Sequence, residues 1–149
     1  MRAVIQRVSS ASVSVDGRII SSIGNGLLIL VGFHRDDKIS DSDYIINKSI
    51  GLRIFEDKAG LMNLSVSDIG GEILIVSQFT LYGDSRAGKR PSFSTSMPSN
   101  EAAEFYDNFI NRFKENFSSL KCGVFGANME VSLANSGPVT IILDSSKIL

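Results

Sequence analysis

Polar side chains interrupt an apolar run in the middle of the sequence. Ile-Leu-Ile-Val at 73–76 is followed by Ser77, Gln78 and Thr80 before the chain becomes apolar again. A buried polar group without a partner costs on the order of 1–3 kcal/mol. These groups therefore either satisfy one another and the neighbouring backbone, or they line a site that uses them. A threonine hydroxyl without an adjacent base is a weak nucleophile, so positioning of a substrate and stabilisation of an oxyanion are the favoured roles.

A second candidate segment is NSGPVT at 135–140. Gly137-Pro138 is typical of a turn into a final strand. An X-Pro bond is cis in only about 5–6% of folded cases, so the dipeptide alone does not predict a cis bond. The residue types at this turn indicate a structural role as readily as a functional one.

The rest of the residue inventory argues against several chemistries. His34 is the single histidine and Cys122 the single cysteine, which disfavours a His-based triad, a disulfide and a multi-cysteine metal site. HRDD and DSD are the only acid-rich stretches, and no Walker or dinucleotide-binding motif is present. We expect no metal and no cofactor, and we expect His34 to be an ordinary loop residue.

Charge gives one local signal. The net charge is −1, but Arg86, Lys89 and Arg90 cluster in DSRAGKRPS. The cluster is either a solvated basic loop or a contact for one or two phosphates, because a long nucleic-acid footprint needs many more cations.

The elements that must position these residues are predicted to form one domain over 1–149. The chain is 43% hydrophobic and 21% charged, as expected of a globular protein. Its start alternates like a strand rather than a signal peptide, and the longest apolar run, 27–33, is too short for a membrane helix. We therefore expect a cytoplasmic protein with no membrane partner.

Strands dominate the predicted order. Asp16-Gly17 indicates a hairpin, and Gly24 to Gly26 a turn into the buried strand 27–33. Further strands are expected at 52–55, at 72–82 and, joined by the Gly-Pro turn, at 129–135 and 139–145.

Two helices are predicted. The first is expected to begin at Ser40, with Asp43 as its capping-box partner, and to end at Gly51. Ser99 is expected to cap the second, whose apolar stripe is most simply core packing: Ala102, Phe105, Tyr106, Phe109, Ile110, Phe113 and Phe117. These elements predict an α+β domain of mostly antiparallel strands, forming a barrel-like or sandwich core with two helices.

SQFTL at 77–81 and NSGPVT at 135–140, taken together, resemble the two signature motifs of the D-aminoacyl-tRNA deacylase family. The resemblance extends through MRAVIQRV, GLLILVG, LRIFED, MNLS, GGEILIVSQFTLYGD, RPSF and FGANMEVSLANSGPVT, essentially the whole chain. Departures such as GNG for the common GPG touch neither signature.

The resemblance implies a homodimer that hydrolyses the ester joining a D-amino acid to the 3′ end of tRNA. It implies a site at the dimer interface, where Ser77, Gln78, Phe79 and Thr80 of one subunit face a cis Gly137-Pro138 turn of the other. Backbone carbonyls of that turn would reject L-amino acids but could not exclude glycine, so glycyl-tRNA is an expected secondary substrate.

Other residues receive roles by the same resemblance. Gln78 and the N–H groups of Phe79 and Thr80 would orient the ester and stabilise the oxyanion, with help from the 2′-hydroxyl of the RNA. Phe79 packs in the core or stacks on adenine. Further residues are substrate-binding candidates (Phe125, Ala127 and Met129) or tRNA contacts (Arg86, Lys89 and Arg90). Two alternatives remain open: a non-catalytic module that binds RNA ends, and a small-molecule-binding β-domain.

Overall fold

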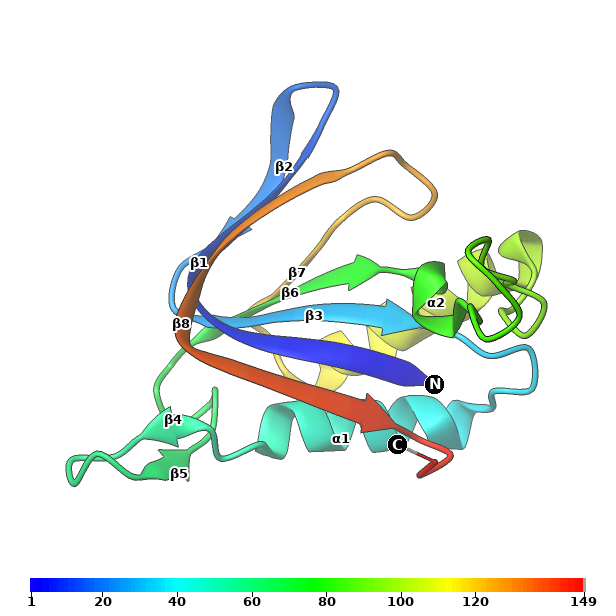
Figure 1. The fold of residues 1–149 in the computed structure, drawn as a ribbon. Helices are drawn as coiled ribbons and strands as arrows, with labels where there is room; N and C mark the ends of the chain where they lie inside the picture. The colour runs from blue at the N-terminus through cyan, green and yellow to red at the C-terminus, as the bar shows by residue number, and fades with distance from the viewer. Residues whose placement is uncertain (149) are drawn as a thin grey trace.

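A strongly bent, six-stranded mixed sheet forms the centre of the computed structural model, which describes residues 1–148 (Figure 1). Its strands are β1 (Arg2–Val15), β2 (Arg18–Ile23), β3 (Gly26–Gly32), β6 (Glu72–Ser77), β7 (Leu120–Cys122) and β8 (Glu130–Asp144). They lie in the order β2-β1-β3-β6-β7, with β8 also paired to β1. The strands β3, β6 and β7 run parallel, and β1 is antiparallel to each of its neighbours.

The bend buries both faces of the central strands. In β3, Leu27 and Ile29 pack into the larger core cluster beneath the helices, whereas Leu28 packs with Val13 and Ile23 in a second cluster. Successive side chains of a strand point to opposite faces, so each face of β3 has its own core. The α+β prediction with a barrel-like core and two helices is therefore confirmed, although the sheet is mixed.

The first hairpin forms as the sequence predicts. Asp16 and Gly17 adopt φ values of 50° and 74° between β1 and β2, the conformation that a two-residue hairpin turn requires. A small separate hairpin pairs β4 (Phe55–Glu56) with β5 (Met62–Leu64). The strand expected at 52–55 is thus shorter and begins later.

The helices α1 (Ile39–Gly51) and α2 (Ser99–Asn116) are present, but their predicted caps are wrong. Lys38 is the N-cap of α1, and the Asp41 carboxylate accepts the Lys38 N–H at 2.8 Å, because Asp41 lies in the first turn. Asp43 instead accepts two hydrogen bonds from Arg112 of α2.

The cap of α2 is Pro98, whose carbonyl accepts the Ala102 N–H at 2.8 Å. Ser99 is therefore the first helical residue. The apolar stripe of α2 packs in the core as predicted, and Phe109 and Phe113 are fully buried.

The strand predicted over 72–82 is wrong beyond Ser77. β6 ends there, and a 3₁₀ helix, η1 (Phe79–Tyr82), follows. The Gln78 N–H still donates to the Val31 carbonyl at 2.7 Å, after which the chain curls over Gly32. A Cβ at Gly32 would lie 2.7 Å from the Gln78 carbonyl oxygen, so only glycine permits this close crossing.

The two strands expected at 129–135 and 139–145 form one strand, β8, and the chain does not reverse at Gly137-Pro138. Asn135 lies opposite Val8 and Thr140 opposite Gln6, so residues 136–139 bulge opposite Arg7 alone. The strand continues because β1 is long enough to pair with both halves of β8.

Candidate functional site

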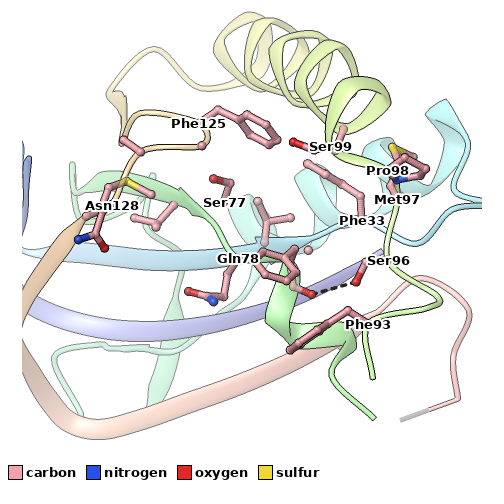
Figure 2. Close-up of a pocket in the computed structure, with 18 of the residues that line it drawn as sticks. Phe33, Ser77, Gln78, Phe93, Ser96, Met97, Pro98, Ser99, Phe125 and Asn128 are labelled. Atoms are coloured by element: carbon pink, nitrogen blue, oxygen red, sulfur yellow. Dashed lines mark hydrogen bonds between the residues drawn. The ribbon is translucent and has the colours of Figure 1, made fainter. Parts of the chain in front are cut away.

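A cavity of about 700 Å³ opens beside the carboxyl end of β6 (Figure 2). Aromatic side chains from four segments line it: Phe33, Phe79, Phe93 and Phe125. Polar side chains lie among them: Ser77, Gln78, Ser96, Ser99 and Asn128. An apolar hollow with a few convergent polar groups is the usual form of a small-ligand site.

Three residues of the SQFT segment line this cavity, namely Ser77, Gln78 and Phe79, and Thr80 does not. Ser77 and Gln78 are half-buried at the end of β6, and Phe79 is 59% exposed. Thr80 is exposed, and its hydroxyl oxygen accepts a hydrogen bond from the Gln78 side-chain amide. The side chains of Gln78 and Thr80 thus bond to one another at an accessible position rather than inside the core.

Phe79 is not a core residue. Its ring contacts the Phe93 ring edge-on, with centroids 5.1 Å apart and an interplanar angle of 67°. Figure 2 shows Phe93 below and Phe125 above the labelled Ser77 and Gln78 in this view. Phe79 and the half-buried Phe93 offer an aromatic surface at the cavity rim, and such surfaces stack readily on bases.

The loop before α2 forms another wall of the cavity, and hydrogen bonds hold this loop in place. The Ser96 hydroxyl donates to the Phe79 carbonyl at 3.2 Å, the dashed contact in Figure 2. The Met97 N–H donates to the Phe33 carbonyl at 3.0 Å. These bonds tie the loop to η1 and to the end of β3, so the wall and the SQFT segment are held as one unit.

The substrate-binding candidates Phe125, Ala127 and Met129 line the same cavity from the segment before β8. Phe125 packs on Tyr106 of α2, with ring centroids 5.4 Å apart. Burial raises the pKa of the Tyr106 hydroxyl, which is therefore neutral at pH 7. Of the predicted substrate contacts, these three converge on the SQFT segment within one protomer.

Gly137 and Pro138 do not line that cavity. Their peptide bond is cis, and both residues are exposed in the β8 bulge. Behind the bulge lies Arg7, which is 7% exposed and donates to the Ser136 carbonyl at 2.9 Å and to the Ile54 carbonyl at 2.6 Å.

Sequence reasoning missed Arg7. The sequence signal for Arg7 is its position in MRAVIQRV, where it follows Ala3 and Ile5 on the face of the strand that is otherwise apolar. A buried arginine is found where its donors have acceptors to satisfy, and here these include the carbonyl that precedes Gly137.

The basic loop lies outside the main cavity. Arg86 pairs with Asp84 at 2.7 Å, and hydrogen bonds from Arg86 hold the pKa of the Asp84 carboxyl well below its usual range. Lys89 and Arg90 are exposed. Arg86 lines a second cavity of about 590 Å³ together with Arg2, His34 and Tyr82.

His34 is partly exposed, its ring lies 5.4 Å from the Tyr82 ring, and its Nδ1 lies 3.5 Å from Asp36. Across residues 1–148, no group of three or more His, Cys, Asp or Glu side chains is arranged to hold a metal ion. No helix within the same residues is long and apolar enough to cross a membrane.

A family model and two curated relatives that match this chain are described as D-aminoacyl-tRNA deacylases. A family model described as D-Tyr-tRNA(Tyr) deacylase matches residues 4–144. The chain is 54% identical over 148 residues to a D-aminoacyl-tRNA deacylase of Thermosipho africanus (strain TCF52B), with 99% of each chain covered. It is 53% identical over 147 residues to a D-aminoacyl-tRNA deacylase of Clostridium botulinum (strain Eklund 17B / Type B), again over 99% of each.

Solved structures show the same fold. A c-Myc DNA Unwinding Element Binding Protein superposes with a TM-score of 0.92 at 41% identity, over 97% of this chain and 98% of the other. A probable eukaryotic D-amino acid tRNA deacylase superposes with a TM-score of 0.79 at 18% identity, over 95% and 97%. At that identity the second likeness concerns the fold alone.

Proposed function

This chain belongs to the D-Tyr-tRNA(Tyr) deacylase family, and we propose that it hydrolyses the ester bond of D-aminoacyl-tRNA, releasing the D-amino acid and tRNA. The observation that carries the proposal is the family match over residues 4–144, which spans both the SQFT segment and the Gly-Pro bulge. The cytoplasm, where tRNA is charged and used, is the proposed location.

The SQFT segment supplies the groups that act on the ester. The N–H groups of Phe79 and Thr80 open a 3₁₀ helix, where the first donors have no partner within the helix. Donors directed at a developing oxyanion stabilise it strongly in a site with little water. Gln78 orients the ester, and Ser77 completes the floor of the cavity.

Water then attacks the ester carbonyl. The tetrahedral oxyanion collapses with departure of the ribose oxygen, which recovers a proton as free tRNA is released. The described residues place no histidine beside Thr80, so the neighbouring 2′-hydroxyl of the RNA is the proposed proton-transfer partner.

The 3′ end of the tRNA occupies the cavity and its rim. The Phe79–Phe93 pair stacks on a base, and Phe125, Ala127 and Met129 contact the terminal nucleoside. Arg86, Lys89 and Arg90 contact the phosphates that precede it. A single-stranded end needs few such contacts, in keeping with a net charge of −1.

The chiral filter comes from a partner subunit in a homodimer. Gly137 and Pro138 are exposed and do not line the cavity of their own protomer, so they are available to a second copy. Backbone carbonyls of this bulge would stand where an L-amino acid carries its side chain and a D-amino acid only hydrogen. Selectivity of this kind acts by rejecting the wrong substrate.

Matched D-tyrosyl-tRNA and L-tyrosyl-tRNA test the proposal. Catalytic amounts of the protein should accelerate release of D-tyrosine and spare the L-ester. Glycyl-tRNA should be hydrolysed as a secondary substrate, because glycine has hydrogen at both α positions. Acceleration of neither tyrosyl ester would overturn the deacylase.

A non-catalytic module that binds nucleic-acid ends is the second candidate. The exposed Arg86, Lys89 and Arg90 favour it, as does the likeness to a c-Myc DNA Unwinding Element Binding Protein. Tight binding of an uncharged tRNA end, with no hydrolysis of any aminoacyl ester, would identify that function instead.

A further inference from the structure

η1 lies between the main cavity and the second cavity described above. Phe79, at its start, lines the main cavity, and Tyr82, at its end, lines the second one. One lining residue of each cavity donates a hydrogen bond to the backbone of this short helix. Ser96 donates to the Phe79 carbonyl from the main cavity, and Arg2 donates to the Leu81 carbonyl from the second.

The Arg2 side chain contacts three residues at once, two in η1 and one in β8. Its Nη1 lies 3.1 Å from the Leu81 carbonyl oxygen, and its Nε lies 3.2 Å from Asp144 Oδ2 at the end of β8. The guanidinium carbon lies 4.6 Å from the centroid of the Tyr82 ring. A guanidinium makes such contacts together because its donors form a rigid planar fork and its face stacks on aromatic rings.

The carboxylate of Asp144, which orients Arg2, is itself held in place. The Asp144 side chain is only 1% exposed, and it accepts hydrogen bonds from the Ser146 N–H and hydroxyl. An anchored, buried carboxylate of this kind fixes the position of the cation paired with it. The Arg2 side chain, 30% exposed, is thereby directed at η1 rather than free in solvent.

We propose that Arg2 is a positioning residue for the catalytic segment, acting through η1, which carries the Phe79 and Thr80 N–H groups. The inference rests on the proposed function of that segment. Arg2 does not line the main cavity, although its backbone pairs with that of Gly32, which does. The effect of the Arg2 side chain on the reaction is therefore indirect. Small displacements of catalytic donors are costly, since a misplacement of about 1 Å lowers rates by about 10²-fold.

Arg2→Met tests the proposal because it keeps an unbranched apolar stem and removes the donors. The single-turnover rate constant for cleavage of D-tyrosyl-tRNA should fall about tenfold, the effect of one hydrogen bond from a charged group, while KM changes little. Amide hydrogen exchange at Leu81 and Gly83, whose N–H groups close the turns of η1, should become faster by a similar factor.

Arg112→Met is the matched control. It removes an Arg–Asp pair between α2 and α1 in which both side chains are partly exposed and Arg112 donates to Asp43 rather than to η1. This variant should lower the thermal midpoint by less than Arg2→Met does, because its ion pair is more exposed. It should keep the wild-type cleavage rate and the wild-type exchange at Leu81 and Gly83.

Arg2 is merely structural if Arg2→Met behaves like Arg112→Met, with a lower thermal midpoint but unchanged cleavage and exchange. Should Arg2→Met fail to fold, Arg2→Lys provides the same comparison, because lysine keeps the charge beside Asp144 but lacks the fork that spans both acceptors. Exchange is measured without substrate, so it decides the role of Arg2 even if the protein hydrolyses no aminoacyl-tRNA.

Discussion

At the scale of single residues, the contact between Gln78 and Thr80 bears on whether the threonine is a nucleophile or a positioning group. The Gln78 amide donates to the Thr80 hydroxyl oxygen, and no histidine or lysine within residues 1–148 contacts that hydroxyl. In the proposed mechanism the Thr80 side chain therefore holds Gln78 in place rather than attacking the ester.

Thr80→Ala is consequently expected to lower the rate of D-tyrosyl-tRNA hydrolysis by less than about tenfold, because one orienting hydrogen bond is lost while the backbone donors remain. Single-turnover cleavage measures the effect. A loss of many orders of magnitude would instead identify Thr80 as the nucleophile.

Gly137 occupies a position where a side chain has no room. A Cβ there would lie 2.8 Å from Arg7 Nη2 and 3.0 Å from Val139 Cγ2, and φ is +122°. Arg7 is buried and held by two carbonyls, so it cannot retreat easily. Both the crowding and the backbone conformation oppose any residue other than glycine.

Gly137→Ala should therefore displace the bulge and lower the preference for D- over L-tyrosyl-tRNA. Gly60→Ala is a matched control, because Gly60 also has a positive φ, +76°, but a Cβ there meets nothing within 4 Å. Both variants should lose stability, and only Gly137→Ala should lose chiral discrimination. Unaltered discrimination in Gly137→Ala would contradict the steric filter.

At the scale of elements, Asp144 joins the end of β8 to the start of β1. Burial opposes its ionisation, but hydrogen bonds from Ser146 and the pairing with Arg2 outweigh this effect and lower the pKa of Asp144. A carboxyl with a lowered native pKa stabilises the fold above its unfolded pKa of about 4, and this contribution is lost as the pH falls through the native pKa.

Asp144→Asn should accordingly destabilise the protein at pH 7 by about 1–3 kcal/mol, the cost of removing one partner from a buried hydrogen-bonded pair. The difference from wild type should shrink as the pH falls below about 4. Thermal unfolding of both proteins between pH 7 and pH 3 measures this. A difference that does not change with pH would mean that the Asp144 charge contributes nothing.

At the scale of the whole molecule, the outer edge of β8 is the surface that the proposed homodimer would use. In the part of the chain that the structure describes, β8 pairs with β1 alone, so its other edge has no partner. Leu133 and Ile142 of β8 are 40% and 59% exposed. An unpaired edge beside exposed apolar side chains is a common site of association.

The protein is therefore expected to elute from gel filtration at twice the mass of the chain.

A mixed dimer shows which subunit supplies the chiral filter. One subunit carries Ala127→Trp, which fills its cavity but leaves the bulge native. The other carries Gly137→Ala, which leaves its cavity open.

In this mixed dimer the one open cavity faces a native bulge if the filter comes from the partner. Discrimination against L-tyrosyl-tRNA should then be restored relative to the Gly137→Ala homodimer. Persistent loss of discrimination would mean that each bulge acts within its own subunit, and elution as a monomer would exclude the shared site.

Much of this molecule could be predicted from local sequence patterns. The hairpin at Asp16-Gly17 and the apolar face of α2 follow from signals a few residues long, because turn geometry and helix periodicity are local properties. The two motifs that carry the family resemblance, SQFTL and NSGPVT, are likewise short, contiguous stretches that can be recognised in the sequence alone.

The tertiary structure decided what depends on contacts between distant residues. The strand around 72–82 ends at Ser77 because the chain crosses over Gly32, and β8 continues past Pro138 because β1 pairs with both of its halves. Arg7 and Arg2 meet their acceptors at separations of 129 and 79 residues. No local pattern encodes such pairs, since sheet register and the bend of β1 bring them together only in the folded chain.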